Sequence, residues 1–254
     1  MRIIKAFAIS FSMYSRIPMP QFEWKEEDMK YPLCFFPWIG AIIGVLLYFW
    51  GWLCDRYGVG AFCYSVIGAA IPMLITGGIH VDGFMDAMDA IHSYQPRERK
   101  LEIMKDSHIG GFSVIMLAVY GLIFTGALSE INDGTILKIF CSGFFLSRCL
   151  SGIGVVSFRS AKKEGLLCTF ADSADRIIVK GALYLQTFAC IGFMLLQSLY
   201  VGSIVVAAAS CVLVYYYFRC NKEFGGITGD TAGYFLIICE GWMAVAAAIL
   251  NLLV

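Results

Sequence analysis

The stretch LCFFPWIGAIIGVLLYFWGWL, residues 33–53, contains no charged side chain. An α-helix rises about 1.5 Å per residue, so a run of this length crosses the roughly 30 Å hydrocarbon core of a bilayer. Further apolar runs follow over residues 59–78, 110–128, 135–156, 177–197, 199–219 and 232–253. The sequence therefore predicts about seven transmembrane helices.

The composition of the whole chain agrees with this prediction. Of 254 residues, 59% are hydrophobic and only 15% are charged, and the mean hydropathy is +0.74, values outside the range of an ordinary soluble domain. No alternating ten-residue pattern of barrel strands occurs, and backbone groups in lipid must be satisfied within a segment. The predicted fold is an all-α, polytopic membrane helix bundle. No linker divides it, so we expect one domain over residues 1–254.

The first 20 residues, MRIIKAFAISFSMYSRIPMP, are too short and too mixed to span a membrane. We expect an interfacial amphipathic helix there, ended by Pro18 and Pro20. No small-residue cleavage site follows an apolar core, which argues against a cleavable signal peptide.

The distribution of Lys and Arg predicts the orientation, because cationic loops stay on the cytoplasmic side. The segments on the other side carry little beyond Arg56. We therefore expect a protein of the cell (inner) membrane with its N-terminus and its catalytic loops, residues 79–109 and 220–232, in the cytoplasm. The cations on that side are Arg2, Lys5, Arg16, Lys25, Lys30, Arg97, Arg99, Lys100, Lys105, Arg159, Lys162, Lys163, Arg176, Arg219 and Lys222.

Two classes of partner or site are not indicated. The ten cysteines are scattered through apolar segments without CxxC pairs, so the pattern favours small buried hydrophobes over disulfides or a zinc site. A formal net charge of zero argues against nucleic acid as a partner.

The densest charge lies in GGIHVDGFMDAMDAIH, residues 77–92. Asp82, Asp86 and Asp89 are spaced by four and then three residues, so a helix would place all three carboxylates on one face. Like charges at that spacing repel, and hard carboxylate oxygens suit Mg²⁺ or Mn²⁺, which take substrate phosphates as further ligands. The alternative is an ordinary solvated helix face, although carboxylates at the end of a membrane helix are costly.

Other polar residues on the same predicted side fit phosphate chemistry. Lys105 offers a point charge for a phosphate, and Asp106 offers a further metal ligand or a group that orients a base. In the turn GGITGD, Thr228 and Gly229 lead into the last helix, where backbone N–H groups meet an anion, and Asp230 supplies another hard ligand. One glycine-rich turn is a weak signal by itself.

Arg148 and His80 each have two possible roles. Arg148 lies inside the apolar run FFLSRCLSG and is expected to bind a phosphate or to pair with one of the aspartates; the alternative is snorkelling to the interface. His80, two residues before Asp82, is a candidate general base or a hydrogen-bonded interfacial histidine. His92 and His108 receive no assignment.

Several of these motifs, taken together, resemble the cobalamin synthase family, the adenosylcobinamide-GDP ribazoletransferases. The likeness covers nearly the whole chain in order, and the central motif is long enough to be specific. Ala90 and His108 depart from it, standing where the family commonly has glycine and often has arginine. The matching motifs are SRIP (15–18), FP-x-x-G-x-x-x-G (36–44), TGG-x-H-x-DG-x-x-D-x-x-D (76–89), RERKLEIMKDS-x-IG (97–110) and GG-x-TGD (225–230) with Glu240.

The resemblance implies a reaction. The 3′-hydroxyl of α-ribazole, or of its 5′-phosphate, attacks the cobinamide-side phosphorus of adenosylcobinamide-GDP, and GMP leaves. Asp82, Asp86, Asp89 and Asp230 would hold Mg²⁺, and one of them or His80 would take the proton. Lys105 and Arg148 would steady the leaving group. Whether the chain forms a homo-oligomer or joins other corrinoid-pathway enzymes is left open.

The residues also admit rivals. A CDP-alcohol phosphotransferase has aspartates at helical spacing, but its pattern has Ala-Arg after DG-x-x, where this chain has Asp86 and Ala87. A membrane prenyltransferase has two Asp-rich motifs that bind a prenyl diphosphate, and the TGD turn of this chain fits that pattern poorly. A transporter also carries charge within the membrane, but it predicts inverted halves with interrupted helices near the midplane, whereas the charge here gathers on one side.

Overall fold

The computed structural model describes residues 2–20, 22–161 and 175–253, so Lys162 and Lys163 lie outside the described residues. Within that part the chain is helical, and the only β-type pairing is an isolated bridge between Ser160 and Ile227. The helices are α1 (Arg2–Tyr14), α2 (Phe36–Tyr57), α3 (Ala61–Thr76), α4 (Ile79–His92), α5 (Arg97–Ile103), α6 (Gly111–Ser129), α7 (Gly134–Ser157), α9 (Arg176–Gln197), α10 (Leu199–Glu223) and α11 (Gly229–Leu253), with short 3-10 helices at Glu26–Lys30 and Pro32–Cys34.

The predicted all-α membrane bundle is confirmed. Among the described residues, six helices are long and apolar enough to cross a bilayer: α2, α6, α7, α9, α10 and α11. The apolar run predicted over residues 59–78 is α3, which has 16 residues and is therefore only about 24 Å long. It is followed by α4 after a bend of 96°, and the bent pair counts as a seventh span if it is taken as one.

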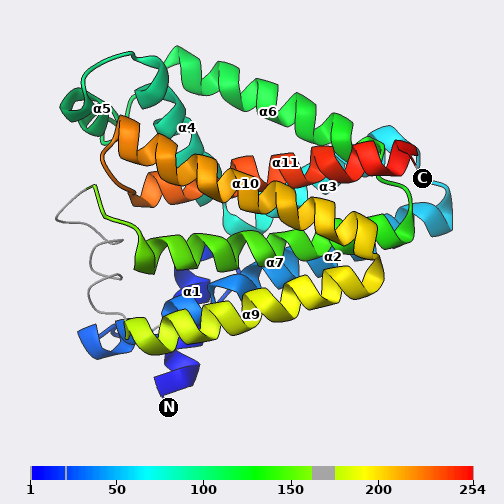
Figure 1. Ribbon diagram of the computed structural model, residues 1–254, viewed down its shortest axis with the longest axis horizontal. Helices are drawn as coiled ribbons and strands as arrows, with labels where there is room; N and C mark the ends of the chain where they lie inside the picture. The colour runs from blue at the N-terminus through cyan, green and yellow to red at the C-terminus, as the bar shows by residue number, and fades with distance from the viewer. Residues whose placement is uncertain (1, 21, 162–174, 254) are drawn as a thin grey trace.

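Helix α7 forms the centre of the bundle. It is buried along most of its length and contacts α2, α9, α10 and α11 (Figure 1). Gly40 and Gly44 of α2 lie directly on it: a Cβ added at Gly40 would be 2.1 Å from the carbonyl oxygen of Phe144, and one at Gly44 would be 2.3 Å from that of Cys141. This small-x-x-x-small spacing lets the two backbones touch, as in other membrane helix pairs.

The predicted polar loop over residues 79–109 is wrong as a loop, because it contains α4 and α5. Apolar side chains recur among its aspartates at helical spacing, and Phe84, Ala87, Met88 and Ile91 are buried. This face packs α4 against α11 and α6. Likewise, the predicted loop over residues 220–232 is mostly the end of α10 and the start of α11.

One end of the bundle, at the left of Figure 1, gathers α5, the C-terminal end of α10 and the first residues of α6, α9 and α11. We call it the α5 end. The C-terminus of the chain lies at the opposite end.

The N-terminal segment forms the predicted short helix, α1. Ile3, Ile4 and Phe7 are exposed, whereas Ile9 and Phe11 are fully buried against the bundle. One face of α1 is therefore part of the protein core, and the other is apolar and uncovered. Its location at a membrane surface stays a prediction.

Candidate functional site

The site begins at the break between α3 and α4. Gly77 and Gly78 have φ values of +66° and +82°, a left-handed conformation that glycine adopts without strain. The segment after α1 lies over this break: the N–H of Arg16 donates to the carbonyl of Ile75 at 2.8 Å. The Arg16 side chain also packs on Gly77, where its Nε would be 2.5 Å from an added Cβ. From the sequence, Arg16 was counted only as a loop cation, although its place in the SRIP motif indicated a more specific role.

Two glycines then bring the backbones of α4 and α11 into contact. A Cβ at Gly83 would be 2.7 Å from the carbonyl oxygen of Asp230, and one at Gly233 would be 2.9 Å from that of His80. Because neither position has room for a side chain, the first turns of the two helices lie against each other. Asp82 and Asp86 flank Gly83 on α4, so the structure brings these aspartates to the helix start that carries Asp230.

The three carboxylates differ in their surroundings. Asp82 is exposed and has no hydrogen-bond or ion-pair partner in the part of the chain that the structure describes, whereas Asp86 and Asp230 are half-buried. Across residues 2–20, 22–161 and 175–253, no three Asp, Glu, His or Cys side chains converge as a ready-made metal cluster. Mg²⁺ is commonly bound by one or two carboxylates plus substrate phosphates, so hard oxygen donors on two touching helices fit its chemistry.

Asp89 has a different environment from the other aspartates of α4. Its carboxylate accepts hydrogen bonds from the backbone N–H groups of Gly110, at 2.6 Å, and Ser113, at 3.0 Å. These groups belong to the start of α6, where the first N–H groups have no partner within the helix. A negative charge there also interacts favourably with the helix dipole. Asp89 therefore caps α6 and fixes it to α4.

The glycine-rich turn ends in a reciprocal cap at the start of α11. The N–H of Thr228 donates to Oγ1 of Thr231 at 2.7 Å, and the N–H of Thr231 donates to Oγ1 of Thr228 at 3.1 Å. The Thr228 hydroxyl also donates to Asp230 at 3.4 Å. Thr228 is buried, while Gly229 is exposed with open space around it. Of these two predicted binding residues, Thr228 orders the turn and Gly229 offers accessible backbone.

Cationic side chains hold this turn from outside. The Arg97 guanidinium lies on Gly225, so any side chain at residue 225 would collide with it. Lys100, also on α5, forms an ion pair with Glu223 at the end of α10. On the other side, the N–H of Ile227 donates to the carbonyl of Arg159 at 2.8 Å. The sequence left Arg97 and Lys100 open between cytoplasmic anchors and functional residues, and their contacts with a turn more than 120 residues away left no local signal.

Lys105 and Asp106 lie in the exposed connection between α5 and α6. Oδ1 of Asp106 accepts a hydrogen bond from the backbone N–H of His108 at 3.0 Å and contacts its Nδ1 at 2.6 Å. These hydrogen bonds lower the pKa of Asp106 below its usual value. The Lys105 side chain is exposed. The structure therefore pairs Asp106 with His108 and does not bring it to the aspartates of α4 in a metal cluster.

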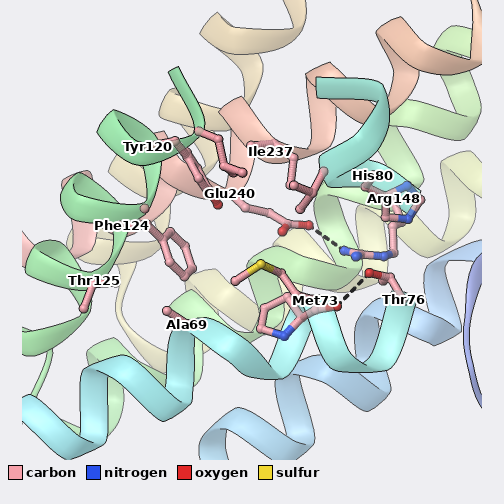
Figure 2. Close-up of a pocket in the computed structure, with 14 residues that line it drawn as sticks. Ala69, Met73, Thr76, His80, Tyr120, Phe124, Thr125, Arg148, Ile237 and Glu240 are labelled. Atoms are coloured by element: carbon pink, nitrogen blue, oxygen red, sulfur yellow. Dashed lines mark hydrogen bonds and ion pairs between the residues drawn. The ribbon is translucent and has the colours of Figure 1, made fainter. Parts of the chain in front are cut away.

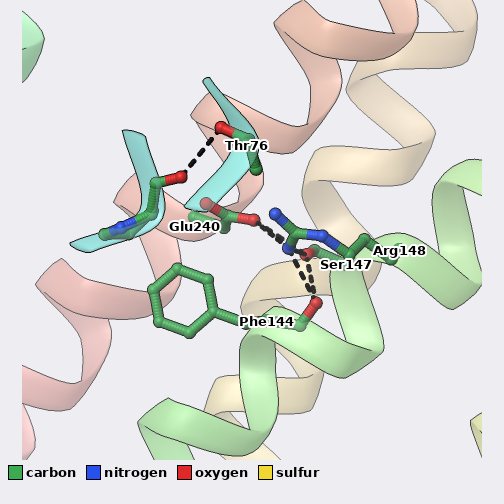
Figure 3. Close-up of polar contacts among 6 residues, drawn as sticks. Thr76, Phe144, Ser147, Arg148 and Glu240 are labelled. Carbon is green, nitrogen blue, oxygen red and sulfur yellow. Dashed lines mark hydrogen bonds and ion pairs between the residues drawn. The ribbon is translucent and has the colours of Figure 1, made fainter. Parts of the chain in front are cut away.

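Arg148 lies in the centre of the bundle, with 1% of its surface exposed. Its Nη1 donates to Oε1 of Glu240 at 2.6 Å and to the carbonyl of Phe144 at 2.9 Å (Figure 3). Ser147 also donates to Glu240, at 3.1 Å. The carboxylate partner of Arg148 is thus Glu240 and not one of the aspartates, and its burial excludes snorkelling to the interface.

His80 faces the interior from the first turn of α4. Residues two apart on an α-helix point about 200° away from each other, so His80 and Asp82 occupy opposite faces. The His80 ring is buried beside Tyr14 and Phe36, at ring-centroid distances of 6.3 and 5.8 Å. It lines a cavity together with Arg148 (Figure 2). This placement separates His80 from the exposed carboxylate that it was expected to assist.

Comparison with known proteins gives a consistent result. The family model described as cobalamin-5-phosphate synthase matches residues 6–248. The chain is 40% identical over 253 residues to an adenosylcobinamide-GDP ribazoletransferase of Lachnoclostridium phytofermentans, covering 98% of this chain and 95% of the relative. Proteins of the same name from Clostridium perfringens and Clostridium botulinum are each 33% identical, over 93% and 94% of this chain and 94% of each relative. No solved structure matches.

Proposed function

Because the chain belongs to the cobalamin-5-phosphate synthase family, we propose that it is the ribazoletransferase that completes cobalamin assembly at the α5 end of the bundle. The observation that supports the proposal is the glycine contact between α4 and α11, where Gly83, the residue after Asp82, lies against the backbone of Asp230. A carboxylate group in that position suits the transfer of a phosphate-linked group.

The proposed substrates are adenosylcobinamide-GDP and α-ribazole or its 5′-phosphate. The 3′-hydroxyl oxygen of the acceptor forms a bond to the phosphorus nearer cobinamide, and the bond from that phosphorus to the bridging oxygen breaks. The bridging oxygen and its electron pair leave with GMP. The hydroxyl proton passes to a carboxylate, and adenosylcobalamin or its 5′-phosphate is the other product.

Asp82 is our candidate for the group that accepts this proton. It is exposed and unpaired within the described residues, so a substrate hydroxyl can reach it. His80 is a poorer candidate because its ring points into the bundle. We therefore favour a carboxylate over the histidine as the general base.

Asp82, Asp86 and Asp230 would hold Mg²⁺, and their hard oxygens suit that ion. When bound, the ion would neutralise charge on the diphosphate. Asp89 is set apart from this group, because both of its oxygens already accept backbone N–H groups of α6. Arg97 and Lys105 are the exposed cations of the α5 region that are open to substrate phosphate, whereas Arg148 is closed off by its pair with Glu240.

The α5 end would face the cytoplasm of a multi-pass protein in the cell membrane. The helices at this end carry Arg97, Arg99 and Lys100 on α5 and Arg219 and Lys222 at the end of α10, and cationic segments stay on the cytoplasmic side. The nucleotide-bearing substrate would then meet the carboxylates without crossing the bilayer.

A donor panel tests the proposed function. Purified protein in lipid nanodiscs is incubated with Mg²⁺, α-ribazole and one of three donors: adenosylcobinamide-GDP, a CDP-alcohol or a prenyl diphosphate. We expect GMP and a corrinoid with the mass of adenosylcobalamin from the first donor only, and no product in the presence of a chelator.

Release of CMP or pyrophosphate would replace the proposal with one of the rival transferases. Movement of a corrinoid into proteoliposomes without any change in its mass would replace it with transport. GMP release that is unaffected by the chelator would remove Mg²⁺ from the proposal and leave the transfer itself in place.

A further inference from the structure

A partly open cavity of about 80 Å³ lies beside the Arg148–Glu240 pair. Its walls come from α3, α4, α6, α7 and α11, which makes it a meeting point of the α3–α4 break and the central helices (Figure 2). Most of the lining is apolar, including Ala69, Met73 and Phe124. The charged or histidine side chains of the lining are His80, Arg148 and Glu240, and its other polar residues are Thr76, Tyr120 and Thr125.

Two residues that line this cavity each have a polar atom without a partner in the described protein. Nε2 of His80 and Nε of Arg148 are both buried and make no hydrogen bond. The two residues are 7% and 1% exposed. Buried polar atoms nearly always have a hydrogen-bond partner, and ordered water supplies it where the protein does not.

The hydrogen-bonding groups and charges of the lining side chains indicate which kind of molecule the cavity can hold. Arg148 Nε can only donate, whereas the neutral His80 ring accepts or donates at Nε2 according to its tautomer. One water oxygen can accept from the arginine while its hydrogen is donated to the histidine. A cavity needs on the order of 10–15 Å³ to hold a water, so this cavity has room for one. An anion would lie against Glu240 and a metal cation against Arg148, so a small neutral molecule fits best.

We propose that this cavity is a water site whose water joins Nε2 of His80 to Nε of Arg148, so that the buried Arg148–Glu240 pair positions the first turn of α4. His80 is then a positioning residue. Its backbone lies against Gly233 of α11, and it precedes Asp82 by two residues in the same turn. The consequence for catalysis rests on the proposed function, whereas the water site itself does not.

Water contact is measured by solid-state NMR on protein with ¹⁵N-labelled histidine in lipid bilayers. The chain has only three histidines, so the His80 signals are assigned from the spectrum of His80→Gln. We expect magnetisation to pass from water to the His80 ring in the wild-type protein. Absence of this transfer would overturn the water site.

Two glycines of α6 provide a matched pair of variants. Gly121 lines the cavity and Gly126 does not, and a Cβ at either position meets nothing within 4 Å. Leucine at residue 121 displaces the water and leaves His80, Arg148 and Glu240 unchanged. We expect Gly121→Leu to abolish water transfer to His80 and Gly126→Leu to retain it. Equal transfer in both variants would contradict the proposal, and Ala69→Val fills the same cavity from α3 if Gly121→Leu does not fold.

The positioning role is tested by kinetics on the same variants. Displaced water lets the first turn of α4 shift, and small misplacement of reacting groups is costly, so we expect kcat for GMP release to fall on the order of tenfold in Gly121→Leu with KM unchanged. An unchanged kcat in a variant that has lost the water would overturn the positioning role. If the wild-type protein releases no GMP at all, the proposed function fails, and the NMR result still decides the water site.

Discussion

Two acidic centres lie in this apolar bundle, and they differ in burial and in whether a cationic side chain is paired with them. Glu240 is 2% exposed and has its cation, Arg148, in contact at 2.6 Å. Asp82, on the first turn of α4, is exposed and has no such cation among the described residues. The buried centre is complete in the protein alone, whereas the exposed one is open to a ligand.

The difference separates a charge that stabilises the fold from a charge that is available to bind a ligand. A carboxylate inside a membrane bundle is costly unless it is paired and hydrogen-bonded, so Glu240 must have a permanent partner. A carboxylate at the α5 end is solvated, so it needs no partner within the protein before a metal ion or substrate binds. Substitutions at the two centres should therefore separate stability from turnover.

The largest effect on stability is expected at the buried centre. Glu240→Ala leaves Arg148 charged and unpaired in the bundle, which costs about 3–5 kcal/mol. Unfolding in mixed detergent micelles, followed by circular dichroism, measures the loss. The double variant Arg148→Met with Glu240→Met removes both charges and should recover most of the stability. If Glu240→Ala alone were as stable as wild type, the ion pair would not hold the bundle.

The next effect is expected at the helix contact that joins the two centres. Gly83→Ala places a methyl group 2.7 Å from the backbone of Asp230, so α4 and α11 must move apart, at a cost of about 1–3 kcal/mol. Turnover should fall as well, because the carboxylates separate. Gly192→Ala, at a position with open space in α9, is the control and should leave both quantities near wild type. Normal turnover in Gly83→Ala would show that the contact between α4 and α11 is not needed for the activity of the site.

A smaller effect is expected at the cap of α6. Asp89→Ala leaves the N–H groups of Gly110 and Ser113 without their acceptor, which costs about 1 kcal/mol of stability. Asp89→Asn keeps an oxygen acceptor and should lose less. The same unfolding assay measures both variants. If Asp89→Asn instead lost turnover as completely as Asp86→Asn while remaining stable, Asp89 would belong with the metal ligands.

The smallest effect is expected at Asp106, whose pairing with His108 is exposed. Because the folded pKa of Asp106 is lowered, its contribution to stability is present at neutral pH and is lost as the pH falls below about 4. Solvent screens this pair, so Asp106→Asn should change turnover at pH 7 by less than about twofold. A loss comparable to that of Asp86→Asn would show that Asp106 binds metal or substrate.

The sequence predicted the elements better than their contacts. Apolar run length is a local property, and the run over residues 232–253 became α11, Gly229–Leu253. The bend after Thr76 was not predicted, because glycines at residues 77 and 78 are compatible with either a loop or a sharp turn. The segment over 79–109 was read as a loop from its charge, although its apolar residues recur at helical spacing.

The site was predicted in its residue types and only partly in its geometry. Aspartates at four- and three-residue spacing correctly indicated a helix, but nothing local distinguished Asp89, which caps α6, from Asp86. Arg148 and Glu240 are 92 residues apart, so their pairing depends on how α7 packs against α11. His80 was placed near the aspartates by sequence distance, although two residues along a helix turn the side chain to the opposite face.

The most direct test of the central claim compares single carboxylates at the two ends of the bundle. GMP release from adenosylcobinamide-GDP is measured in nanodiscs for Asp86→Asn and for Asp55→Asn, an exposed aspartate near the C-terminal end of α2. We expect Asp86→Asn to lose turnover by on the order of 100-fold or more at wild-type stability, and Asp55→Asn to stay active. Equal turnover in the two variants would contradict a site built on the carboxylates of α4.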